Sequence, residues 1–326
     1  MRVAFLTQDL QLSGGVGVIV AHALQLARNG FEVDLVLTRA TDRPDWSHRG
    51  LASVNVVQLP RARARSYDVA LATWWETAQH LFDLDAGRHA CFVQSMEDRF
   101  YDPGEPRRRG AALPQELPVR FVTEARWIAD TLEAMRPGEK VFYVRNGIAK
   151  DVFAPVSNVP VSGGGPLRIL IEGSARVQSK GVRDALAAVR AMSAPRHVTV
   201  VAPDGSAGGL AGTDRAAGPI SQRELATLYA ETDVVLKLSR VEGMFGPPLE
   251  GFHKGATCVV TPVTGHEEYV VHDENGLVVD WDDQTGTARA LDLLARDRAL
   301  LHRLRCGALA TARSWPSWEQ QGQVMA

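Results

Sequence analysis

The sequence predicts an α/β protein of two doubly wound domains, each built around a largely parallel β-sheet. Short runs rich in apolar and β-branched residues alternate with helical patterns from end to end. The chain has 326 residues, more than the roughly 250–300 at which a single core usually stops growing. One Pro-, Gly- and Ser-rich stretch, FAPVSNVPVSGGGP (153–166), interrupts the alternation and is the expected linker.

The first domain is expected over residues 1–152. Its expected strands are 2–7, 32–37, 54–59, 68–73, 90–94, 119–123 and 141–144. Between the first two, VGVIVAHALQLARNG has apolar residues at helical spacing, and Gly30 is the expected end of that helix.

The second domain is expected over residues 167–313. Its expected strands are 167–173, 197–202, 233–239, 258–261 and 276–279, with helices near 181–192, 221–231, 284–296 and 298–313. Periodicity does not place the tail, 314–326. In doubly wound sheets, ligands bind beyond the carboxyl ends of the strands. We therefore expect the two domains to face a central cleft that holds the site.

Composition excludes several classes of protein. The 36 basic and 38 acidic side chains give a net charge of −2, which disfavours a duplex nucleic-acid binder. The three cysteines are far apart and suggest neither zinc nor a disulfide framework, so we expect a cytoplasmic protein. The start, MRVAFLTQDL, reads as a strand and not as a signal peptide. No apolar run approaches the ~20 residues that span a bilayer, so any membrane contact is expected to be peripheral.

Two glycine-containing turns are candidate phosphate sites. In SGGVGVIVAH, Gly14 and Gly15 come at an expected helix start, where backbone amides favour an anion. A loop that merely needs positive φ explains these glycines equally well. In EGSARVQSKGV, Arg176 and Lys180 follow Gly173 and precede a helix, whose dipole disfavours cations there. A bound diphosphate would reconcile this misfit, and solvation of both side chains is the alternative.

The stretch VEGMFGPPLEGFHKG carries two glutamates around a glycine and proline loop. Pro248 suits the first turn of a helix, so we expect a helix from about residue 248 with Glu250 in its first turn and Glu242 on the loop. Each carboxylate can accept two hydroxyl hydrogen bonds, as a vicinal diol offers. Two such acids, with the amides of 244–246 and the cations between them, suit a nucleotide-sugar. An N-terminal capping role for Glu250 is the alternative.

With seven residues between them, Glu242 and Glu250 resemble the E-x7-E motif of the retaining glycosyltransferases of family 4, which have the GT-B fold of two Rossmann-like domains. Four other segments also resemble that family: SGGVGVIVAHALQLARNGFEVDLV, YVRNGI, GSARVQSKG and TGHEEYVVHDENGLVVD. All five occur in the family's order, over most of the chain. The stretch with Trp315 and Trp318 resembles the terminal helix that crosses back to the first domain.

The resemblance implies a role for each matched residue. Arg176 and Lys180 would neutralise the diphosphate leaving group, Glu250 would bind the ribose, and Glu242 would face the donor sugar. The donor would also contact Gly14, Gly15, Gly173, Met244, Phe245 and Gly246. No cofactor or metal is expected, because the cations take the metal's place.

Two shorter matches, ATWWETAQ and CFVQSMEDRFY, resemble bacterial polysaccharide enzymes that include rhamnosyltransferases. Where many family members place a histidine near the reacting sugar, this region offers the acceptor-side candidates Trp74, Trp75, Glu76, Gln94 and Glu97. The resemblance therefore supplies no histidine for the contact to the sugar's primary hydroxyl, which would suit a 6-deoxy sugar. The acceptor could be a glycan, a lipid-linked molecule or a small metabolite. A nucleotide-sugar epimerase or hydrolase of the same fold, or a non-catalytic nucleotide-sugar-binding subunit, would use the same residues.

Overall fold

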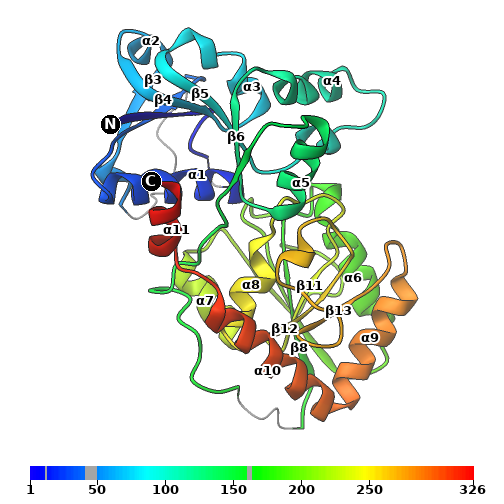
Figure 1. The fold of residues 1–326 in the computed structure, drawn as a ribbon. Coiled ribbons are helices and arrows are strands. Elements are labelled where there is room, and N and C mark those ends of the chain that lie inside the picture. The colour runs from blue at the N-terminus through cyan, green and yellow to red at the C-terminus, as the bar shows by residue number, and fades with distance from the viewer. Residues whose placement is uncertain (12, 41–49, 160–163) are drawn as a thin grey trace. The chain divides into compact units, whose positions relative to one another are not determined.

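The computed structural model describes residues 1–11, 13–40, 50–159 and 164–326. The chain divides into two compact units (Figure 1): unit 1 is Met1–Gly147 with Pro316–Ala326, and unit 2 is Ile148–Trp315. Each unit is an α/β structure around one parallel sheet, which confirms the predicted fold class. The division falls earlier than the expected linker at 153–166. Phe153 is buried in unit 2 with its ring 6.3 Å from that of Tyr229, and residues 160–163 of that stretch lie outside the described ones.

Unit 1 is centred on a seven-stranded sheet in the order β3-β2-β1-β4-β5-β6-β7. The strands are β1 (Arg2–Thr7), β2 (Glu32–Leu37), β3 (Asn55–Gln58), β4 (Ser66–Ala72), β5 (Asp85–Val93), β6 (Arg120–Thr123) and β7 (Val141–Tyr143). The helices are α1 (Gly14–Arg28), α2 (Leu59–Ala62), α3 (Trp75–Ala78), α4 (Pro106–Ala112), α5 (Arg126–Met135) and α11 (Trp318–Met325), with short 3₁₀ turns η1 (Leu51–Ser53), η2 (Leu81–Asp83), η3 (Glu97–Phe100) and η4 (Leu113–Glu116). The strand order reverses direction between β1 and β4, which makes their carboxyl ends the switch point where ligands usually bind.

The C-terminal helix α11 packs against α1 within unit 1. The ring of Trp318 lies 5.1 Å from that of His22. A Cβ on Gly147 would lie 2.3 Å from the Trp318 amide nitrogen, so only glycine permits this approach. Trp315, three residues earlier, is buried in unit 2 against Tyr269.

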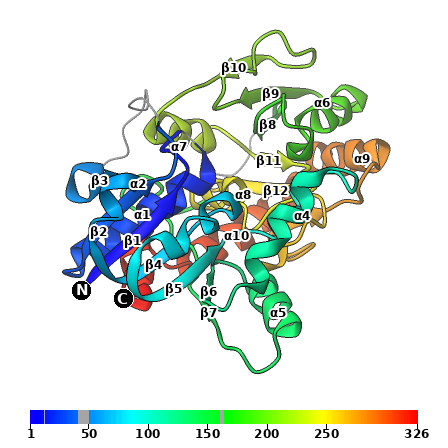
Figure 2. The same ribbon diagram turned by 90° about the horizontal axis from the view of Figure 1, so that it is seen from above.

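Unit 2 is centred on a six-stranded parallel sheet in the order β10-β9-β8-β11-β12-β13. The strands are β8 (Leu167–Glu172), β9 (Arg196–Val201), β10 (Arg215–Ala217), β11 (Val234–Lys237), β12 (Thr257–Val260) and β13 (Gly276–Val278). The helices are α6 (Val182–Ala191), α7 (Gln222–Ala230), α8 (Gly246–His253), α9 (Gln284–Arg296) and α10 (Arg298–Ser314), with 3₁₀ turns η5 (Gln178–Lys180) and η6 (His266–Glu268). Helix α6 packs beside α9 (Figure 2), and α8 packs against α10. Here the order reverses between β8 and β11.

Three details differ from the sequence prediction. Strand β5 begins at Asp85, five residues before the expected 90, because the polar segment DAGRH still pairs with β4 through its backbone. Strand β10 is absent from the prediction, since its three residues, RAA, carry no apolar pattern. Helix α8 begins at Gly246 and not near 248. In the described part of the chain, no helix is both long and apolar enough to cross a membrane.

Candidate functional site

The switch point of unit 2 brings together the last residues of two neighbouring strands. Glu172 ends β8 and Lys237 ends β11. The Lys237 ammonium donates to the Glu172 main-chain oxygen at 3.2 Å and lies 3.5 Å from its carboxylate Oε2. Only 3% of the Lys237 side chain is exposed. Burial opposes ionisation of this lysine, but the Glu172 and Glu242 carboxylates outweigh it and raise the lysine pKa.

Two glycines set the position of Lys180 beside this switch point. Gly173 has φ +146°, and a Cβ there would lie 3.3 Å from the Lys180 Cβ. Gly181 has φ +64°, and a Cβ there would lie 1.9 Å from the Leu238 carbonyl oxygen. A backbone hydrogen bond from Arg240 N to Ser179 O, 2.8 Å, also joins the two segments. The turn before α6 therefore lies directly against the chain that leaves β11.

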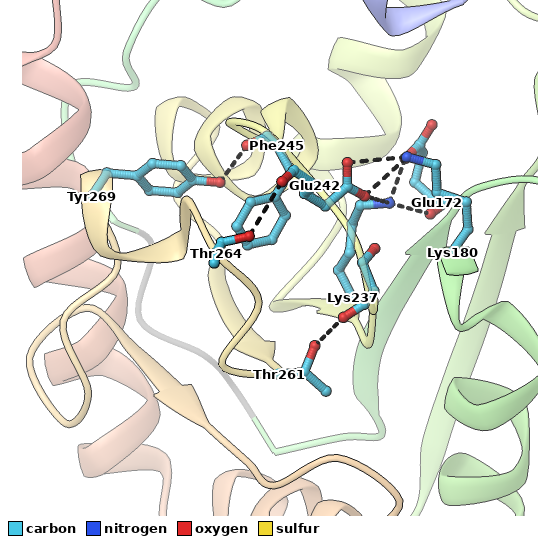
Figure 3. Close-up of polar contacts among 9 residues, drawn as sticks. Glu172, Lys180, Lys237, Glu242, Phe245, Thr261, Thr264 and Tyr269 are labelled. Carbon is cyan, nitrogen blue, oxygen red and sulfur yellow. Dashed lines mark hydrogen bonds and ion pairs between the residues drawn. The ribbon is translucent and has the colours of Figure 1, made fainter. Parts of the chain in front are cut away.

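Glu242 is the centre of the resulting charge cluster (Figure 3). The Lys180 ammonium lies 3.0 Å from both of its carboxylate oxygens, and the Lys237 ammonium lies 3.6 Å from Oε1. Burial alone would raise the pKa of Glu242, but the two lysines outweigh it and hold that pKa below its usual value. The carboxylate is therefore ionised at neutral pH and held from two sides.

Hydroxyl groups from the segment after β12 fix the loop that carries Glu242 (Figure 3). Thr261 Oγ1 donates to the Ser239 carbonyl at 2.6 Å, and Thr264 Oγ1 donates to the Glu242 carbonyl at 3.4 Å. The Tyr269 hydroxyl donates to the Phe245 carbonyl. The side chains of Phe245 and of its neighbour Met244 are buried. The loop is consequently held by contacts on both its main chain and its side chains.

Glu250 lies in the second turn of α8 and not in the first, because the helix begins at Gly246. Its Oε1 lies 3.8 Å from where a Cβ on Gly246 would be, so the carboxyl group is next to the start of the helix. The N-cap residue is Phe245, which leaves no capping role for Glu250. Burial, and then the neighbouring Glu172 carboxylate, raise the pKa of Glu250 to about 8.

Arg176 is exposed, and its amide donates to Ser174 Oγ at 3.1 Å. Two serine hydroxyls, with a smaller contribution from the Arg176 charge, lower the pKa of Asp204 to about 2. The structure thus places Lys180 with Glu242, and Arg176 near Asp204.

Unit 1 brings the glycine turn close to one acceptor-side candidate. Ser13 Oγ accepts the Val16 amide and caps α1, which begins at Gly14. A Cβ on Gly15 would lie 3.5 Å from the Gln94 side-chain amide. The start of α1 and the end of β5 therefore meet at these two residues.

The other acceptor-side candidates lie after β4 and β5. The buried Glu97 accepts the Trp75 amide at 2.6 Å, and burial raises the pKa of Glu97 to about 8. The Trp74 ring, half-buried, lies 6.0 Å from the ring of Phe100, which is 40% exposed. Glu76 accepts hydrogen bonds from Gln8 and Arg39 at its Oε2.

Glu172 and Lys237 are absent from the sequence prediction. The available signal was a lysine that follows the apolar run VVL within one expected strand and a glutamate that follows the largely apolar run LRILI within another. Among the residues that the structure describes, no group of three or more His, Cys, Asp or Glu could hold a metal ion.

Sequence comparison gives partial matches. Residues 166–297, most of unit 2, match the family model described as Glycosyl transferases group 1. A stretch of 107 residues is 32% identical to D-inositol 3-phosphate glycosyltransferase from Xylanimonas cellulosilytica. That stretch is 33% of this chain and only 25% of the relative's length.

Structure comparison covers the whole chain. Sucrose-phosphate synthase from Thermosynechococcus elongatus superimposes with a TM-score of 0.78 at 15% identity, over 99% of this chain and 96% of that one. HepE from Anabaena, in complex with UDP-glucose, gives 0.75 at 14% identity, over 100% and 98%. The protein therefore has the GT-B fold of glycosyltransferases, as the motifs predict.

Proposed function

We propose that the protein is a glycosyltransferase that moves a sugar from a nucleoside diphosphate to an acceptor hydroxyl, with retention at the anomeric carbon. The observation that carries the proposal is the Lys180–Glu242 pair, on the loop that leads from the carboxyl end of β11 into the helix that carries Glu250. All three residues fall within the stretch that matches the glycosyltransferase group 1 model. The bound UDP-glucose in the structure of HepE, which has the same fold, also supports a nucleotide-sugar donor.

In this proposal the positive side chains act on the leaving group. The bond from the anomeric carbon to the phosphate oxygen breaks, and the acceptor oxygen bonds to the same face of the sugar. Lys180 and Arg176 stabilise the negative charge that grows on the released diphosphate. The leaving phosphate oxygen takes the proton of the acceptor hydroxyl, so the protein need not supply a base.

The remaining groups bind and orient the substrates. Glu250 accepts the ribose hydroxyls, and Glu242 faces the donor sugar. Gly173 and the main chain of 244–246 would contact the sugar and phosphates, and Gly14 and Gly15, at the start of α1, are the further donor-binding candidates. Trp74, Trp75, Glu76, Gln94 and Glu97 form the acceptor side.

The two short matches to rhamnosyltransferase-like enzymes favour a 6-deoxyhexose as the first sugar to test. The proposed setting is bacterial glycan or glycosylated-metabolite biosynthesis in the cytoplasm, with at most a peripheral membrane contact. The acceptor would be a glycan, a lipid-linked molecule or a small metabolite.

The test begins with thermal stabilisation of the purified protein by UDP, GDP, ADP and dTDP and by their sugars. Donor turnover is then measured with and without candidate acceptors. Transfer that requires the acceptor supports the proposal. Turnover without acceptor indicates a hydrolase or epimerase, and binding without turnover indicates a non-catalytic subunit.

Matched lysine variants test the site within that assay. Lys180→Met is expected to abolish most of the transfer activity. The control, Lys254→Met, removes an equal charge from the end of α8, where Lys254 donates to the Ala154 carbonyl. This variant is expected to keep its transfer activity. A fully active Lys180→Met variant would refute the assignment.

The proposal includes independence of divalent metals, because lysine and arginine provide the charge that a metal would otherwise supply. Transfer should therefore survive excess EDTA. Activity that is lost in EDTA and restored by Mg²⁺ would refute this part.

A further inference from the structure

The two lysines that contact Glu242 differ in how firmly they are held. The Lys237 side chain is 3% exposed, whereas that of Lys180 is 34% exposed. Lys237 ends a strand in the core of the sheet, and Lys180 ends a short 3₁₀ turn. One ammonium group is thus enclosed, while the other has access to solvent.

Lys237 is fixed by three acceptor atoms from two residues. Its ammonium is 3.2 Å from the Glu172 carbonyl, 3.5 Å from the Glu172 carboxylate and 3.6 Å from Glu242 Oε1 (Figure 3). Leaving this position would deprive both the main-chain oxygen and the carboxylate of Glu172 of this partner, and would remove one of the two cations that contact Glu242. We therefore expect Lys237 to stay in place when a ligand binds.

Lys180 can move without such a loss. Its four-carbon stem is flexible, and its turn is anchored through main-chain contacts at Ser179 and Gly181, which a change of side-chain rotamer leaves intact. A diphosphate at the strand ends offers it several charged oxygens in exchange for the two of Glu242.

That exchange would leave the buried Glu242 carboxylate with one fewer positive partner. We propose that Lys237 is a positioning residue that holds Glu242 in place when Lys180 leaves it for the diphosphate of the donor. This inference rests on the proposed function and assigns the two lysines different roles within it. Lys237, the inner lysine, holds Glu242, and Lys180, the outer lysine, binds the ligand.

The proposal makes the effect of Lys237 depend on Glu242. In Lys237→Met, Lys180 is the one of the two lysines that remains beside Glu242, so the diphosphate must compete harder for it. In Glu242→Gln, Lys180 is already released, and Lys237 has no carboxylate to hold at that position. If Lys237 instead contacted the ligand directly, Lys237→Met would weaken binding equally in both backgrounds.

The experiment is a double-mutant cycle on nucleotide binding, measured by isothermal titration calorimetry. The probe is whichever of UDP, GDP, ADP or dTDP stabilises the wild-type protein most. Lys237→Met is expected to weaken binding about tenfold in the wild-type background and less than about twofold in the Glu242→Gln background. Lys254→Met, the matched control, should bind like wild type in both. If Lys237→Met does not fold, Lys237→Gln replaces it, since its amide can still donate to the Glu172 carbonyl.

The outcomes separate this inference from the proposed function. Equal losses in both backgrounds, or no loss in either, overturn the inference while nucleotide binding stands. A purely structural role would also give equal losses, together with a lower melting temperature in both backgrounds. A wild-type protein that binds none of the four nucleotides overturns the proposed function and the inference with it.

Discussion

Glu250 gives the sharpest prediction about donor binding, because its pKa is raised to about 8 by burial and by the Glu172 carboxylate. At neutral pH the carboxyl group is therefore mostly protonated. In the proposed complex it accepts two ribose hydroxyls, and the ionised carboxylate, which only accepts, suits this role better than the protonated acid. Binding of the donor should then release a proton, and affinity should increase as the pH rises towards 8.

The size of the effect follows from this pKa. If the bound carboxylate stays ionised above pH 6, binding at pH 7.5 releases about three quarters of a proton. Between pH 6.5 and 8.5, affinity should rise about 25-fold, equivalent to about 2 kcal/mol. Calorimetry in two buffers of different ionisation enthalpy measures the released proton directly. UDP-glucose is a suitable first probe, since its diphosphate diester does not titrate in this range.

Two variants test the assignment. Glu250→Gln should abolish the proton release. Glu97→Gln removes a second carboxyl group whose pKa burial raises to about 8, this one in unit 1, and should leave the release unchanged. The reasoning would be refuted if the wild-type protein released no proton on binding UDP-glucose, or if the Glu250→Gln variant still released it.

Three further predictions concern stability. Gly181→Ala would place a Cβ 1.9 Å from a carbonyl oxygen, so it should lower the melting temperature and weaken nucleotide binding by more than Gly205→Ala. The control also has positive φ, but nothing lies within 4 Å of its Cβ position. Burial lowers the pKa of His22 to about 4, so the unfolded chain binds a proton more readily than the folded one. Unit 1 should therefore lose about 3 kcal/mol of stability as the pH falls from 6.5 to 4. Urea unfolding of His22→Leu should show no such loss. Arg305, 1% exposed, lies 3.3 Å from Asp233, and thermal unfolding of Arg305→Met should show unit 2 destabilised by about 3 kcal/mol; an unchanged transition would contradict this.

The sequence predicts the fold well because its strands are buried in parallel sheets. Runs such as RVAFLT and LRILIE are apolar through most of their length, so their bounds are clear without tertiary information. Strand β10, with the sequence RAA, is held by main-chain pairing with β9 at the edge of the sheet. Backbone pairing leaves no side-chain pattern, and so the prediction missed it.

The candidate site could be predicted only in part from the sequence. The spacing of residues shows which ones are close along the chain, but not in which direction their side chains point. Arg176 and Lys180 lie four residues apart in one turn, yet only Lys180 contacts Glu242. Gly181 decides this by letting the turn approach the chain after β11, a contact that involves a residue 57 positions away in the sequence. The Glu242 and Glu250 roles stay predictions.

The charge pairing changes what nucleotide binding must accomplish. The sequence alone predicts that Lys180 is a cation whose partner is the phosphate of the ligand. In the structure it already neutralises Glu242, and Lys237 already neutralises Glu172 and part of Glu242. Binding is then an exchange of ion pairs, and its free energy is the difference between the Lys180–diphosphate and Lys180–Glu242 interactions. The Lys180 side chain is 34% exposed and that of Lys237 is 3% exposed, so releasing the outer lysine uncovers less buried charge than releasing the inner one. In the proposed exchange the inner lysine therefore stays with the acid.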